Sequence, residues 1–113
     1  MTGRRAASWV SLLTGVGFAL GSTVHAVSGV LLFWGFEVYG PGYPGWRHVA
    51  FSMIDATIAC IAWQAPRWLV FPLAVFAIDQ AIEHGVTPVV VLVTIAAAFT
   101  AHERWTHSHR AAY

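Results

Sequence analysis

The sequence has no lysine, a single cysteine and few charged residues of any kind. All six basic residues are arginines, charged residues make up 10% of the 113 residues, and the formal net charge is +1. Without a basic stripe the chain is poorly suited to a phosphate backbone, so we expect no nucleic-acid partner. Cys60 lies in an apolar run and has no partner in the chain, which excludes an intrachain disulfide and a CxxC site.

Apolar residues, in contrast, are abundant. Hydrophobic residues make up 58% of the chain and include six tryptophans, and a soluble domain of this size has too little interior to bury them. A lipid bilayer can cover such a surface, because a membrane helix consists of about 20 mostly apolar residues. We therefore expect one transmembrane domain over residues 1–113, with the lipid bilayer as its main partner.

Four apolar runs separated by turn signals predict an all-α protein. Segment 35–45 is rich in glycine and proline, which is typical of a loop. Pro66 ends the second run, because the residue before a proline disfavours the helical conformation. Gly85 is a predicted helix C-cap, Thr87 an N-cap and Pro88 a first helical position. The sequence thus predicts an integral membrane four-helix bundle, antiparallel and up-down, with spans at about 8–34, 46–64, 67–84 and 88–105.

The first run also resembles a secretory signal, because Arg4 and Arg5 precede it and Val24-His25-Ala26 would be a tolerable cleavage site. The run continues as far as Trp34, however, which favours a membrane helix. With four spans, one side of the membrane receives all the arginines except Arg47. Cytoplasmic loops carry the excess of arginine, so we expect a multi-pass protein of a bacterial inner or plasma membrane with both termini in the cytoplasm.

Ionisable residues inside the predicted spans point to a polar site. Each one costs roughly 2.5 to 3.5 kcal/mol on insertion scales, so each should face protein or trapped water. His48 and Asp55 are seven residues apart on the second run, and Asp79 and Glu83 are four apart on the third, spacings that place each pair on one helical face. A tight turn joins these two helices, so we expect them to be antiparallel neighbours whose polar faces meet. We therefore expect an outward-facing cavity centred on Asp55 and Asp79.

The first run contributes a stripe of small residues that carries one imidazole. His25 stands in a four-residue repeat with glycines at positions 17, 21 and 29, a pattern that lets another helix approach closely. Whether the stripe packs within the chain or between chains is open. Because four spans fit into only 113 residues, we expect a homo-oligomer or a larger membrane complex.

The leading hypothesis for the function is binding of, or acid–base chemistry on, a small or lipophilic ligand, as in an isomerase or cyclase. Carboxyls and imidazoles at different depths can hold different protonation states and so divide the roles of acid and base. The candidate catalytic residues are Asp55, Asp79, Glu83, His25 and His48.

Three alternatives stay open. The chain could be an accessory or structural subunit, in which the polar groups only hold helices together. It could couple transport to protons or cations, since intramembrane carboxyls and histidines form relays. It could also bind a transition metal or haem through His25, His48 and His84, although nothing in the sequence requires a cofactor.

Overall fold

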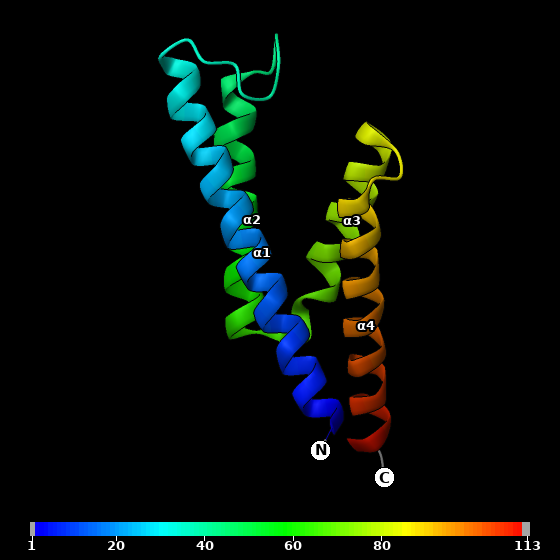
Figure 1. Cartoon of the computed structure of the whole chain (residues 1–113). Coiled ribbons are helices and arrows are strands. Elements are labelled where there is room, and N and C mark those ends of the chain that lie inside the picture. Colours follow the sequence, from blue (N-terminus) through cyan, green and yellow to red (C-terminus); the bar gives the residue numbers. More distant parts are fainter. Residues whose placement is uncertain (1, 112–113) are drawn as a thin grey trace.

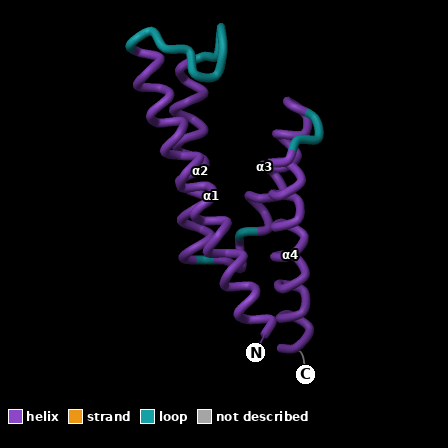
Figure 2. The backbone as a smooth tube through the Cα atoms, viewed as in Figure 1, coloured by secondary structure: helices purple, strands orange, loops and turns teal. Residues whose placement is uncertain are grey.

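The computed structural model describes the backbone of residues 2–111 and the side chains of residues 9–106. It consists of four α-helices and one short 3-10 helix, without a strand in the described residues, so the all-α prediction is confirmed (Figures 1 and 2). The elements are α1 (Thr2–Phe33), α2 (Gly45–Gln64), η1 (Pro66–Trp68), α3 (Val70–His84) and α4 (Pro88–Ala111).

The helix ends have local causes that were visible in the sequence. Gly85 has a φ of 74°, and its N–H donates to the Ala81 carbonyl, which closes α3. The Thr87 hydroxyl accepts a hydrogen bond from the Val90 N–H at 3.2 Å and thereby caps α4. Two helices are longer than their predicted spans. α1 begins at Thr2 and α4 continues to Ala111.

The helices form two antiparallel pairs rather than a closed bundle. α1 packs against α2, and α3 packs against α4, while α1 and α4 make a smaller contact. Figures 1 and 2 show the pairs close together from η1 to the chain ends, which lie at the same end of the molecule, and diverging from η1 toward the opposite end. The expectation that α2 and α3 pack along their lengths is not met, although a tight turn joins them.

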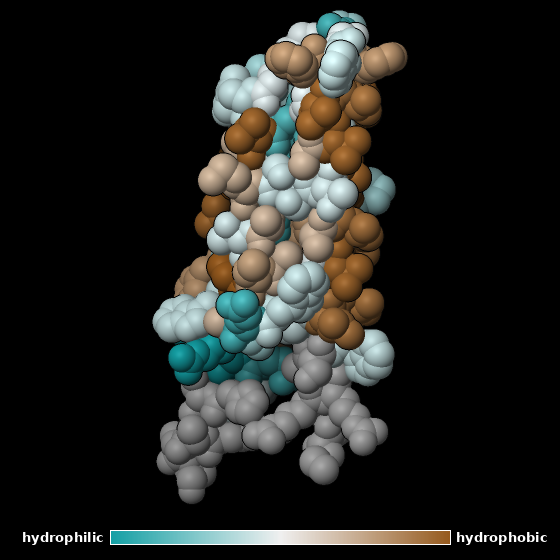
Figure 3. All heavy atoms as spheres, turned by 90° about the vertical axis from the view of Figure 1, so that its left-hand side faces the viewer, coloured by the Kyte–Doolittle hydropathy of each residue, from teal (hydrophilic) through white to brown (hydrophobic). Residues whose placement is uncertain are grey.

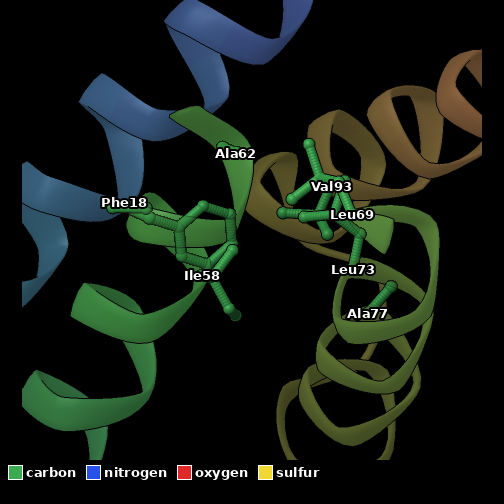
Figure 4. Packing of buried hydrophobic residues seen from close by; sticks show 8 residues of the cluster. Phe18, Ile58, Ala62, Leu69, Leu73, Ala77 and Val93 are labelled. Carbon is green, nitrogen blue, oxygen red and sulfur yellow. The ribbon is translucent and has the colours of Figure 1, made fainter. Parts of the chain in front are cut away.

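The buried core is small and lies close to this junction. Its members are Phe18, Ile58, Ala59, Ala62, Leu69, Leu73, Ala77 and Val93 (Figure 4). Leu69 and Leu73 are completely buried. The Phe18 ring of α1 meets the Phe76 ring of α3 edge to face, with 5.0 Å between centroids. The core therefore ties the two helix pairs together at one level and leaves the rest of each pair uncovered.

Large apolar side chains are exposed on all four helices. Examples are Leu20 on α1, Met53 on α2, Ile82 on α3 and Leu92 on α4, and Ile82 is 80% exposed. Figure 3 shows the left-hand side of Figure 1, where apolar side chains (brown) follow one edge for most of its length. A surface of this kind is typical of a protein that contacts lipid or a partner.

One helical segment in the described part of the chain, Trp9–Phe33, is long and apolar enough to cross a membrane, judged by length and composition. α3 has only 15 residues, and α2 carries Arg47 and Asp55. A single such segment near the N-terminus is also compatible with a signal sequence. The finding therefore gives limited support to membrane association, and the other three spans stay predictions.

Candidate functional site

Two predicted site residues meet at the end of the α1–α2 pair that carries the loop 34–44, which we call the loop end. His25 of α1 and His48 of α2 face each other with 3.2 Å between their Nδ1 atoms. His48 is only 2% exposed. Gly29 makes this approach possible, because a Cβ atom there would lie 3.2 Å from the Cβ of His48.

The loop 34–44 folds back over the histidine pair. The Tyr39 ring lies 4.9 Å from the His25 ring and the Tyr43 ring 4.6 Å from the His48 ring, measured between centroids. The Tyr39 hydroxyl is 3.5 Å from His25 Nε2. Burial, together with the neighbouring Tyr43 and Asp55, raises the pKa of the Tyr39 phenol above its usual value of 10.0. Tyr39 is therefore a neutral phenol at physiological pH, able to donate and to accept a hydrogen bond.

A serine pair forms the next layer of the α1–α2 interface. The Ser22 hydroxyl donates to the Ser52 carbonyl at 2.8 Å, and the Ser52 hydroxyl donates to the Ser22 carbonyl at 3.1 Å. We did not predict these residues. Ser52 could have been found from its spacing, because it lies four residues after His48 and three before Asp55 and therefore on the same helical face.

Asp55 lies deeper in the same interface and is only 5% exposed. Its carboxyl group faces Gly21, where an added Cβ would lie 2.7 Å from Asp55 Oδ2. Asp55 Oδ1 is buried and has no hydrogen-bond partner among the described residues. Buried polar atoms are nearly always hydrogen-bonded, so an unpartnered carboxyl oxygen is an exception that calls for an explanation.

The two predicted carboxylates of α3 lie elsewhere. Asp79 is exposed and accepts a hydrogen bond from Gln80 Nε2 at 3.4 Å. Glu83 forms an ion pair with Arg47 of α2. Asp55 thus faces α1 while Asp79 lies on the exposed side of α3, so the two do not share the cavity that we expected between them.

Arg47 connects the loop end to α3. Its guanidinium lies 5.5 Å from the Tyr43 ring centroid and 5.4 Å from that of Phe51, while it pairs with Glu83. The Phe51 ring stacks on His25 with 5.4 Å between centroids. Aromatic rings therefore pack around the histidine pair, and the Arg47 guanidinium lies over two of these rings.

The three histidines proposed as metal ligands are not brought together. His84 lies at the end of α3, where its Nε2 is 3.7 Å from Glu83 Oε2, away from the pair on α1 and α2. Among the described residues, no three His, Cys, Asp or Glu side chains are grouped to hold an ion.

Comparisons with protein-family models, with curated proteins and with solved structures find no match to this chain.

Proposed function

We propose that this protein is a multi-pass membrane protein with an acid–base site for a small ligand between α1 and α2, entered from the loop end. The observation that carries the proposal is the buried carboxyl of Asp55 with its unpartnered oxygen. Leaving such an oxygen without a donor is costly. Either a proton on the carboxyl or a donor group on a bound ligand lowers that cost.

The polar residues that lie between Asp55 and the loop end support entry of the ligand from the loop end. Asp55, the Ser22–Ser52 pair and the His25–His48 pair follow one another along the α1–α2 interface. At 1.5 Å per residue, Asp55 and His48 are about 10 Å apart along α2. A carboxyl and an imidazole at different depths can differ in protonation and so serve as acid and base. Glycines keep the helices close, which favours a small ligand.

The exposed apolar surface supports four membrane spans. Apolar side chains are exposed on every helix, and each helix coincides with one of the four predicted apolar runs. Both chain ends lie at one end of the molecule, as in an up-down topology (Figure 1). The excess of arginine at that end favours a cytoplasmic location for both termini, with the loop end outside.

An accessory subunit is the second candidate, and the divergence of α2 from α3 favours it. Apolar residues of α3 such as Val75 and Ile82 are exposed, and a second copy or another membrane subunit could cover them. In that case Asp55 and the serine pair would only hold α1 against α2.

Infrared spectroscopy of the protein in liposomes, recorded as the pH is changed, separates the two candidates. We expect a carboxyl C=O band that appears and disappears with pH, is absent from Asp55→Asn and persists in the matched control Asp79→Asn. The amide keeps hydrogen-bonding capacity but cannot exchange the proton. If Asp55→Asn folds normally and the wild type shows no band that this substitution removes, Asp55 has a structural role and the accessory reading holds.

A further inference from the structure

We infer that His25 and His48 form a binding site for a divalent transition-metal ion of the copper or zinc class. The inference rests on the proposed function in one respect, because it takes the loop end of the α1–α2 pair as the ligand-binding end. The Nδ1 atoms of the two imidazoles face each other at 3.2 Å. If an ion were bound to both atoms with metal–nitrogen bonds of about 2.0 to 2.1 Å, the nitrogen–metal–nitrogen angle would be roughly 100°, close to the tetrahedral value.

Tyr39 supplies the second observation. A neutral imidazole carries its proton on one nitrogen only. When His25 Nε2–H donates to the Tyr39 hydroxyl, 3.5 Å away, Nδ1 keeps its lone pair and directs it toward His48. Metal-binding histidines typically have such a partner on their second nitrogen. Tyr39 is thus a positioning residue for the metal site.

The pair is preorganised. His48 is buried, and the rings of Tyr39 and Tyr43 lie 4.9 and 4.6 Å from its own. The rings of Phe51 and Tyr39 contact His25 in the same way. Rings held in this manner lose little freedom when an ion binds, and imidazole nitrogen suits Cu²⁺ and Zn²⁺ better than Mg²⁺ or Ca²⁺.

Two protein ligands leave coordination positions open. No third His, Cys, Asp or Glu side chain joins the pair among the described residues, so water or a small molecule would complete the ion's coordination. Open positions are characteristic of catalytic rather than structural metal sites.

A metal titration of the purified, untagged protein in detergent tests this inference. The apoprotein is titrated with Cu²⁺ and with Zn²⁺, bound metal is measured after equilibrium dialysis, and electron paramagnetic resonance reports the copper ligands. We expect one ion per chain with imidazole nitrogen coordination. Tyr39→Phe should weaken binding about 10- to 100-fold, and His25→Gln should weaken it further.

Controls keep the result interpretable. His25 is partly exposed, so His25→Gln should fold even where His48→Gln does not, and circular dichroism checks the helix content of each variant. His84→Gln and His102→Gln should bind as the wild type does. The inference is overturned if His25→Gln binds as tightly as the wild type, or if the wild type binds no ion.

The two proposals can fail separately. Asp55→Asn should leave metal binding intact, because Asp55 lies a serine layer below the histidines. If the wild type binds no ion but shows the Asp55 infrared band, the metal site alone is rejected. Metal binding without that band would reject the acid–base role of Asp55 alone.

Discussion

The two helix pairs differ in what fills their interfaces. Between α1 and α2 lie glycines, a reciprocal serine pair, two histidines and a buried aspartate. The buried residues of α3 and α4 are instead apolar: Leu73, Ala77, Val90 and Val93. The buried polar groups that the proposed site uses therefore lie in α1–α2, whereas the buried part of α3–α4 is apolar.

In the membrane location proposed for this protein, the physics of helix association in lipid accounts for this contrast. Without water, apolar side chains gain little by leaving lipid for protein, so close packing and interhelical hydrogen bonds hold the helices together. α1–α2 uses both, through Gly21 and Gly29 and through the Ser22–Ser52 bonds. In α3–α4 the buried side chains are apolar, and the Thr94 hydroxyl bonds within its own helix to the Val90 carbonyl.

The largest effect on stability should come from Leu73→Ala. Leu73 is completely buried, and removing its side chain leaves a cavity that costs about 2 to 5 kcal/mol of unfolding free energy. The matched control Val75→Ala, on the exposed side of α3, should change it by less than about 0.5 kcal/mol. Chemical unfolding in detergent measures both. Equal losses in the two variants would contradict the idea that α3–α4 has an apolar core.

Gly21→Ala should lower the free energy of unfolding by an intermediate amount. The added Cβ would lie 2.7 Å from Asp55 Oδ2, and overpacking of this kind costs about 1 to 3 kcal/mol. At Gly17, four residues earlier on the same helix, the added Cβ meets nothing within 4 Å. Gly17→Ala should therefore be neutral or stabilising by up to about 1 kcal/mol, through helix propensity. If both alanines stabilise the protein, α1 and α2 do not approach as closely as described.

Ser52→Ala should lower the free energy of unfolding by less than Leu73→Ala or Gly21→Ala does. Hydrogen bonds between membrane helices contribute about 0.6 kcal/mol on average and at most about 1.7. The control is Thr57→Ala, because the Thr57 hydroxyl is exposed and bonds only within α2, to the Met53 carbonyl. A double-mutant cycle with Ser22→Ala isolates the interhelical contribution. A coupling energy of zero would show that the serine pair does not contribute to the association of α1 with α2.

The sequence predicted the helices well because their signals are local. Pro66, Gly85, Thr87 and Pro88 each restrict the backbone at their own position, and helix ends follow from them. The contact between His25 and His48 could also be predicted from the sequence, because the glycine stripe indicates the face of α1 that another helix approaches. In the structure, Gly21 and Gly29 face α2, while Gly17 is open.

The position of α3 could not be predicted in the same way. A spacing of four residues places Asp79 and Glu83 on one helical face, but it says nothing about which neighbour that face meets. We assumed that a tight turn makes α2 and α3 pack along their lengths. Contact with η1 and packing of Leu69 and Leu73 at the junction direct α3 toward α4 instead. Asp79 is consequently exposed.

For the membrane protein proposed above, the burial of Asp55 against Gly21 also bears on how the chain enters the bilayer during its synthesis. α2 carries Arg47, His48 and Asp55, and as a single segment it would expose costly groups to lipid. α1 leaves the ribosome first and offers a glycine face on which Asp55 and His48 are hidden. We therefore expect the translocation machinery to receive α1 and α2 as one hairpin. Gly21→Ala should accordingly lower the yield of inserted protein as well as its stability.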